Sequence, residues 1–243
     1  MALTIWRFIL IYVIYVIICL FFAAISYSIL KRDIRDRLNQ LLALFHLFLV
    51  FSLISNFIYA SISDPSLEYV VEFMHKFSMY LIIVASGFLF LFIILLYNPE
   101  NKFSSIKYQI LFLIIYNLFG IGAFFISDGV TIDILSDGTQ LYPVWNVYFF
   151  IYYIAILLPN MIFSLFITIK IYKKFQIEAL AKRMKKFLLG LCCIYYMGFG
   201  VGITNFLNIP LLRTIFTLTQ AVPIIGVILI YYSVGTSLKE SKQ

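Results

Sequence analysis

Seven long apolar stretches dominate this chain and leave only short polar gaps between them. The stretches cover residues 6–30, 40–60, 77–97, 109–127, 145–169, 187–208 and 211–234. Each has about the 20 residues that an α-helix needs to cross a hydrocarbon core of ~30 Å. The pattern therefore predicts an all-α, polytopic membrane protein with a seven-transmembrane helix bundle.

The basic residues lie almost entirely in alternate gaps, which indicates how the chain crosses the membrane. Of the 18 Lys and Arg residues, all but Arg7, Lys76 and Arg213 follow the first, third, fifth or seventh stretch. They are Lys31, Arg32, Arg35, Arg37, Lys102, Lys107, Lys170, Lys173, Lys174, Lys182, Arg183, Lys185, Lys186, Lys239 and Lys242. Because cytoplasmic loops are enriched in Lys and Arg, we expect the N-terminus outside and the C-terminus inside.

Composition supports a membrane protein and argues against a nucleic-acid partner. Hydrophobic residues make up 63% of the chain and charged residues 12%, against ~45–50% and ~25% in soluble domains. A net charge of +7 would suggest nucleic acid in a soluble protein. Here the basic residues face one side of a bilayer, so the expected partner is the anionic inner leaflet. The expected location is the cell membrane.

The chain is predicted to form one transmembrane domain, residues 1–236, followed by a short cytoplasmic tail, residues 237–243. An alternative for the first stretch is a signal peptide, with a core at residues 8–22 and a cleavage site near Ala23 and Ala24. A signal peptide has its positive charges before the apolar core, whereas the basic run KRDIRDR follows it here. We therefore favour an uncleaved first helix.

A short external β-hairpin is predicted between the fourth and fifth helices. Residues 127–144 read SDGVTIDILSDGTQLYPV, and β-favouring runs at 130–135 and 139–144 flank a Ser-Asp-Gly turn sequence. Two such runs around a short turn indicate a hairpin. It would either cover the mouth of the bundle as a lid or simply connect two helices. The acidic residues of this gap lack the spacing of a calcium-binding loop.

Groups that perform catalysis are scarce within the apolar stretches. No Asp or Glu lies inside one, and His46 is the one histidine well within a stretch. His75 lies at the outer edge beside Lys76, too far along the chain to suggest a zinc cluster or a catalytic triad with His46. We interpret His46 as a hydrogen-bonded packing residue. The chain is therefore expected to be no enzyme and to hold no metal or cofactor.

Polar and aromatic residues in the outer half of the bundle form the candidate ligand-binding site. Helical spacing places several of them on shared faces, and Arg213 would attract an anionic group of a ligand. The candidates are Asn56, Tyr59, Trp145, Tyr152, Asn205, Asn208, Arg213, Thr217 and Gln220. The alternative is that they join helices through hydrogen bonds worth ~0.6 kcal/mol each, with the aromatic residues in an interfacial belt.

Two further features point to contacts with other molecules or helices. The basic segment 170–186 is predicted to be helical, and it either anchors the chain at the headgroups or docks a cytoplasmic signalling protein. The candidate partner-contact residues are Lys182, Arg183, Lys185 and Lys186. Gly198 and Gly202 form a GxxxG pair that predicts close helix packing, within the bundle or in a homo-oligomer.

Several motifs resemble a known family. The third helix ends at LLYNPENKFS, the hairpin leads into YPVWNVYFFIYY, and the basic turn LAKRMKKFLLG and the short link NIPLLRT follow. Over most of its length the chain is similar to the seven-transmembrane sensor region at the amino terminus of many prokaryotic histidine kinases. The resemblance implies sensing of an external or membrane-embedded signal, passed to a kinase or cyclase domain after the seventh helix. Only about ten residues follow Ser233, so the signal would pass to a separate protein.

These observations together predict a receptor-like membrane sensor that binds a small or lipidic ligand and signals to a separate cytoplasmic partner. One alternative is a small transporter or carrier, which would show repeated features in its two halves. No such repeat is evident, since the first three helices lack the Pro and Gly pattern of the last three. The other alternative is a structural subunit of a membrane complex.

Overall fold

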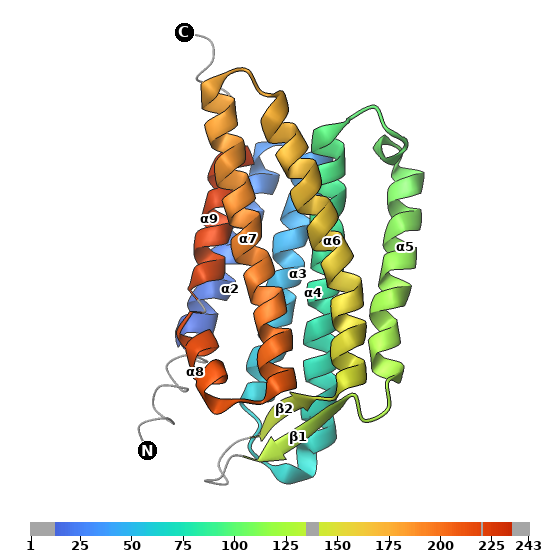
Figure 1. Ribbon diagram of the computed structural model, residues 1–243, viewed down its shortest axis with the longest axis vertical. Coiled ribbons are helices and arrows are strands. Elements are labelled where there is room, and N and C mark those ends of the chain that lie inside the picture. The colour runs from blue at the N-terminus through green and yellow to red at the C-terminus, as the bar shows by residue number, and fades with distance from the viewer. Residues whose placement is uncertain (1–12, 135–140, 220, 235–243) are drawn as a thin grey trace.

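The computed structural model describes residues 13–134, 141–219 and 221–234. Figure 1 shows a bundle of long, roughly aligned helices with a small sheet at one end. The helices are α2 (Tyr15–Arg32), α3 (Arg37–Ala60), α4 (Glu68–Tyr97), α5 (Ile106–Gly122), α6 (Val147–Lys174), α7 (Glu178–Leu207), α8 (Pro210–Leu218) and α9 (Val222–Val234). Three short 3-10 turns are η2 (Pro65–Leu67), η3 (Lys102–Ser104) and η4 (Ala123–Phe125).

Within the described ranges, seven helical segments are long and apolar enough to cross a membrane. The segments are α2, α3, η2 with α4, α5 with η4, α6, α7, and the segment Pro210–Val234 that contains α8 and α9. Consecutive segments run in opposite directions, so the connections after α2, α4 and α6 all lie at one end (Figure 1). The prediction of a seven-helix, membrane-type bundle is therefore confirmed.

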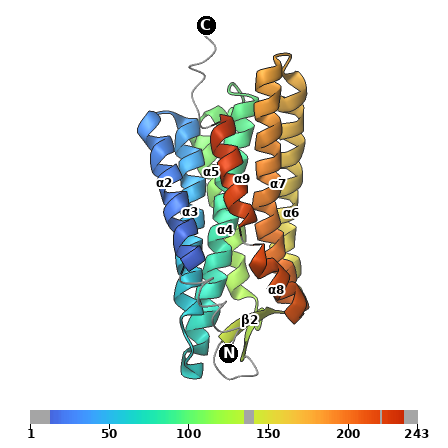
Figure 2. The ribbon, with the colours of Figure 1, turned by 90° about the vertical axis from the view of Figure 1, so that its left-hand side faces the viewer.

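The seventh predicted helix, residues 211–234, is not continuous. α8 ends at Leu218 and α9 starts at Val222, and Figure 2 shows the two as separate segments. Pro223 has no N–H group, so it cannot donate to the carbonyl of Thr219 as a continuous helix requires. That carbonyl instead accepts from the N–H of Val222 at 3.0 Å. Proline at the second position of α9 costs nothing, because the first turn of a helix makes no such bond.

The third predicted helix begins earlier than its apolar stretch, which started at residue 77. α4 starts at Glu68, so only residues 61–67 link it to α3. The carboxylate of Asp64 accepts a hydrogen bond from the N–H of Ser66 at 2.9 Å, and Pro65 follows it. An Asp cap followed by Pro starts a helix regardless of how apolar the next residues are.

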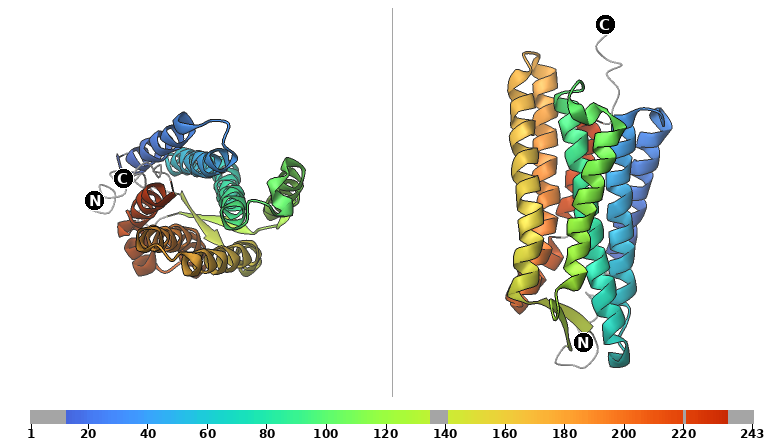
Figure 3. Two further views of the ribbon diagram at one scale, coloured as in Figure 1. Left: turned by 90° about the horizontal axis from the view of Figure 1, so that it is seen from above. Right: turned by 90° about the vertical axis from the view of Figure 1, so that its right-hand side faces the viewer.

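The basic segment 170–186 is helical at both ends and broken in the middle. α6 continues to Lys174 and α7 starts at Glu178, so residues 175–177 turn the chain. The expectation of helix through this segment holds except at that turn. α6 and α7 extend beyond the neighbouring helices at this end of the bundle (Figure 3).

A two-stranded antiparallel sheet lies between α5 and α6, where the hairpin was predicted. β1 (Val130–Ile134) pairs with β2 (Leu141–Trp145), with Val130 opposite Trp145 and Ile134 opposite Leu141. The predicted turn residues 136–138 lie outside the described residues. The sheet covers the end of the bundle opposite the connections after α2, α4 and α6 (Figure 1).

The helices differ in how much of their surface is buried. α4 lies in the centre, packs against α3, α5 and α6, and is mostly buried, whereas α5 lies at the periphery with most of its residues exposed (Figure 3). Residues such as Ile83, Leu89, Leu91 and Ile93 of α4 are fully enclosed. α4 therefore forms much of the buried centre of the bundle.

Candidate functional site

The hairpin is held on the bundle by the last residue of β2, Trp145. Its side chain is 2% exposed, and its indole Nε1–H donates a hydrogen bond to Nε2 of His75 on α4 at 2.7 Å. Phe149 and Tyr153 of α6 pack edge-on against the indole, with ring centroids 4.8 and 5.0 Å away. Trp145 thus joins the hairpin to two helices through one side chain.

The hydrogen bonds of His75 fix which of its ring nitrogens carries the proton. An indole nitrogen can only donate, so Nε2 of His75 must be the acceptor and carries no proton. The proton of the neutral ring is then on Nδ1, which lies 3.1 Å from the hydroxyl oxygen of Tyr59 on α3 and donates to it. The chain of hydrogen bonds from Trp145 through His75 to Tyr59 has one direction only, and it links β2, α4 and α3.

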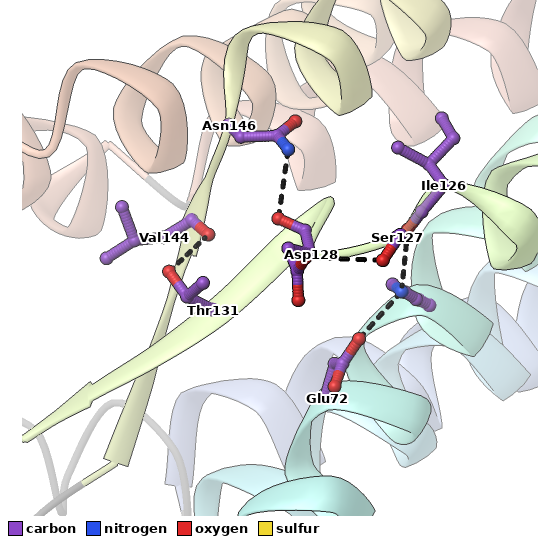
Figure 4. Close-up of polar contacts among 8 residues, drawn as sticks. Glu72, Ile126, Ser127, Asp128, Thr131, Val144 and Asn146 are labelled. Atoms are coloured by element: carbon purple, nitrogen blue, oxygen red, sulfur yellow. Dashed lines mark hydrogen bonds and ion pairs between the residues drawn. The ribbon is translucent and has the colours of Figure 1, made fainter.

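The start of the hairpin is attached to α4 and α6 by separate contacts. Lys76 forms an ion pair with Glu72 at 2.7 Å and donates to the carbonyl oxygen of Ile126 at 3.4 Å. Asn146 donates to the carbonyl of Asp128 at 2.9 Å, and its side-chain oxygen caps α6. Figure 4 shows these groups around the loop that leads into β1. The hairpin is therefore fixed at both of its ends.

Arg213 of α8 holds the hairpin from the other side. Its guanidinium donates to the carbonyl oxygen of Pro143 at 2.8 Å and lies 4.7 Å from the centre of the Tyr142 ring. A guanidinium over an aromatic face is an attractive cation–π contact. We call Tyr59, His75, Trp145 and Arg213 the hairpin-end cluster.

The predicted ligand-binding residues are only partly brought together. Tyr59, Trp145 and Arg213 belong to the hairpin-end cluster. Four other candidates lie on three helices: Asn56 on α3, Asn205 and Asn208 at the end of α7, and Thr217 on α8. Asn205 is buried, and the other three are half-buried. Tyr152 lies apart, because its hydroxyl donates to the carbonyl of Phe119 on α5. Gln220 lies outside the described residues.

A second polar group, in the centre of the bundle, was not among the predicted site residues. Asn160 of α6 donates to the Tyr116 hydroxyl at 3.0 Å and to the Ser86 carbonyl at 3.2 Å. The hydroxyl of Tyr195 donates to Asn160 Oδ1 and lies 3.0 Å from both that atom and Ser164 Oγ. Ser86 and Tyr116 are also bonded to each other, at 2.9 Å. We call these five residues the central network; it links α4, α5, α6 and α7.

A small cavity adjoins the central network. Its volume is about 30 Å³, and its lining includes Ser86, Tyr195 and Gly198 among apolar side chains such as Phe45 and Leu157. A space of this size accommodates about one water molecule. The centre of the bundle is therefore nearly closed in this conformation.

His46 packs as the sequence predicted. It is fully buried, and its Nδ1 donates to the carbonyl of Leu42 at 2.6 Å. The rings of Phe22 and Phe45 contact it edge-on. Nε2 has no hydrogen-bond partner among the described residues. His46 therefore joins α2 to α3 mainly by packing.

The predicted glycine pair faces the inside of the bundle. A Cβ added to Gly198 would lie 3.5 Å from Leu157, and one added to Gly202 would lie 3.3 Å from the ring of Trp145. A closer backbone approach lies elsewhere on α7, where a Cβ on Gly190 would lie 2.7 Å from the carbonyl oxygen of Gly226 on α9. The GxxxG spacing did not reveal that crossing, because its two glycines come from different helices.

The candidate partner-contact residues lie on the first turns of α7. Lys182 pairs with Glu178 at 2.7 Å, with both side chains largely exposed, a contact worth only ~0.3–0.5 kcal/mol. Lys185 and Lys186 are exposed and Arg183 is half-buried. The segment thus presents its positive charge away from the bundle.

These features define a multi-pass helical membrane protein with a hairpin packed on one end and a basic surface at the other. Comparison with models of protein families gave no match, and comparison with curated proteins gave none. Among the described residues, no three His, Cys, Asp or Glu side chains gather in a metal-binding arrangement.

Proposed function

We propose that this chain is a receptor-like sensor of the cell membrane, which binds a small or lipidic ligand at the hairpin end and signals to a separate cytoplasmic protein at the basic end. The observation that carries the proposal is the attachment of the hairpin. Through Trp145 and Arg213 its second strand bonds to α4 and α8, and Trp145 also packs on α6. A ligand that displaces the strand acts on several helices at once.

The charge distribution supports the orientation. The basic residues that follow α2, α4 and α6 lie together at one end of the bundle (Figure 1). Since Lys and Arg are enriched on the cytoplasmic side, this end faces the cytoplasm and the hairpin faces outside. The N-terminus is then outside and the C-terminus inside.

Helix length supports an output at the basic end. α6 has 28 residues and α7 has 30, which correspond to ~42 and ~45 Å of helix, more than the ~30 Å of a hydrocarbon core. At this end α6 and α7 project beyond the neighbouring helices (Figure 3), and the first turns of α7 contain Lys182, Lys185 and Lys186. A projecting positive surface favours an acidic partner.

The central cavity is compatible with a sensor. Its volume of about 30 Å³ accommodates about one water molecule. A sensor needs no larger space in the middle of the bundle. It needs two packings of its helices that differ in affinity for the ligand, with ~1–3 kcal/mol for ordinary coupling.

The test is an affinity purification from native membranes, with mass spectrometry of the proteins that bind. We expect a soluble signalling protein that is lost from the double variant Lys185→Gln/Lys186→Gln. The matched control is Lys102→Gln/Lys107→Gln, which removes two exposed charges at the same end of the bundle and should retain the partner. Equal loss in both variants would reduce the role of α7 to general attraction to anionic surfaces. Recovery of integral membrane proteins alone would favour a structural subunit, and recovery of a transported solute would favour a carrier.

A further inference from the structure

A groove opens on the side of the bundle between α6 and α7, away from the hairpin-end cluster. Its volume is about 280 Å³, close to the lower limit of ~300 Å³ for small-molecule pockets. The wall is apolar and includes Met161, Leu165, Cys192, Tyr195, Phe199 and Ile203. The groove is therefore large enough for part of an extended hydrocarbon chain.

The groove opens toward the bilayer. Met161 and Leu165 lie in the middle of α6, which has residues Val147–Lys174 and is one of the membrane-type segments. Their neighbours Ile162 and Phe166 are more than half exposed. Apolar side chains exposed at mid-span contact lipid tails in a membrane. Hydrocarbon, and no water, is then the medium outside this groove.

α8 lies against two of the residues that line the groove, Tyr196 and Gly200. The ring of Phe216 lies directly over Gly200, in the space that a Cβ would need. The hydroxyls of Tyr196 and Thr219 are hydrogen-bonded to each other at the junction of α8 and α9. The groove is therefore built by two helices, α6 and α7, and α8 fixes one side of its wall.

Tyr195 is the wall that the groove shares with the centre of the bundle. It lines both the groove and the 30 Å³ central cavity. Its ring is 5% exposed, and its hydroxyl donates to the central network through Asn160 and Ser164. A molecule in the groove touches one side of this ring while its hydroxyl holds α6 and α7 together on the other.

We propose that the groove binds an acyl chain of a membrane lipid, which enters sideways from the bilayer and contacts Tyr195. The open side meets lipid tails, and the wall is apolar and shaped by two helices. The bound chain contacts Tyr195, and Tyr195 is hydrogen-bonded within the central network, which links four helices. Binding in the groove can therefore change the packing of these helices. This site is separate from the hairpin end, so its occupancy does not depend on the sensor proposal.

The experiment uses the full chain in phosphatidylcholine nanodiscs that contain a phosphatidylcholine with a photoreactive diazirine in the middle of one acyl chain. After illumination, the cross-linked residues are identified by mass spectrometry. We expect cross-links concentrated on Met161, Leu165 and Phe199. Cys192→Trp places a large side chain in the groove and should abolish them. Leu189→Trp adds similar bulk at an exposed position of α7 outside the groove and should preserve them.

Two outcomes would overturn the proposal. One is cross-linking spread equally over the exposed faces of α5 and α6 and unchanged by Cys192→Trp, which would indicate ordinary lipid contact. The other is efficient disulfide cross-linking of two copies through Cys192, which would show that a second copy covers the groove. If Cys192→Trp does not fold, Ile203→Trp fills the groove from its rim and takes its place. Because the readout is lipid contact alone, a failure here leaves the sensor proposal standing.

Discussion

The hairpin end and the centre of the bundle both contain buried polar side chains, but these side chains differ in how many hydrogen-bond partners they have. In the hairpin-end cluster each ring nitrogen of His75 has one hydrogen-bond partner, Trp145 on one side and Tyr59 on the other. In the central network Asn160 and Tyr195 each have more than one. A lost group at the hairpin end leaves a buried atom unpaired, whereas a lost group at the centre leaves its neighbours with other partners.

The largest effect is expected for Trp145→Phe. It keeps an aromatic ring but removes the Nε1–H group, so Nε2 of His75 stays buried without a donor. An unsatisfied buried acceptor costs ~1–3 kcal/mol, and we expect about 2 kcal/mol in the free energy of unfolding. The measurement is reversible unfolding in mixed detergent micelles.

Two companion variants make that result specific. Tyr148→Phe changes an exposed tyrosine at the start of α6 and should stay within ~0.5 kcal/mol of the wild type. The double variant Trp145→Phe/His75→Leu removes both partners and should lose less stability than the two single losses added together. Strict additivity would mean that the hydrogen bond contributes nothing.

A smaller effect is expected for Asn160→Leu at the centre. The variant loses contacts on both sides of the amide, but Tyr116 keeps Ser86 and Tyr195 keeps Ser164. The single proton of the Tyr195 hydroxyl can pass to Ser164, so the net loss is the two bonds that the Asn160 amide donates. At ~0.6 kcal/mol for each interhelical hydrogen bond, these two give about 1.2 kcal/mol. A loss equal to that of Trp145→Phe, in the same unfolding measurement, would remove the distinction between the two regions.

Adding one methyl group at each glycine of the GxxxG pair tests the difference between the hairpin end, near Gly202, and the centre of the bundle, near Gly198. In Gly202→Ala the methyl would lie 3.3 Å from the Trp145 ring, so the ring must move and bend its bond to His75. We expect a loss of about 1 kcal/mol, at the low end for overpacking. Gly198→Ala places its methyl 3.5 Å from Leu157 beside the central cavity and should change stability by less than ~0.5 kcal/mol. The measurement is thermal unfolding of both variants under the same conditions. A larger loss of stability in Gly198→Ala than in Gly202→Ala would contradict the prediction.

Within the central network, the smallest loss is expected for Tyr195→Phe. It removes one hydroxyl from the central network while Asn160 Oδ1 keeps the donor Ser164 at 3.3 Å. The expected loss is about 0.6 kcal/mol. The ring still forms the wall of the groove, so lipid cross-linking to Met161 and Phe199 should be unchanged. Loss of that cross-linking would mean that the hydroxyl, and not the shape of the ring, organises the groove.

The candidate site could be predicted only in part, for identifiable reasons. Tyr59, Trp145 and Arg213 were found because they are polar or aromatic residues near the ends of apolar stretches. His75 connects two of them, Tyr59 and Trp145, but the sequence placed it outside the third helix because the apolar stretch begins after it. The helix in fact starts at Glu68, after the cap at Asp64, and therefore includes His75. Tyr152, one of the predicted site residues, bonds to the backbone of α5, away from the hairpin-end cluster.

The central network lay beyond sequence reasoning for another reason. Tyr116 and Asn160 are 44 residues apart, and Tyr195 is 35 residues further along. Helices that are apolar all round show no preferred face from which to read their rotation. Only the packing of α4, α5, α6 and α7 brings these hydroxyl and amide groups within hydrogen-bonding distance.

The sequence by itself determined the class of the protein, the number of its long apolar segments and the presence of two strands between α5 and α6. Length and apolarity are enough for this, because a membrane helix satisfies its own backbone hydrogen bonds without a partner. The tertiary structure decided which residues contact each other: His75 and Trp145, Asn160 and Tyr195, and the backbones of Gly190 and Gly226. Those contacts depend on the rotation and tilt of each helix. Packing against neighbouring helices sets both, so they cannot be read from the local sequence.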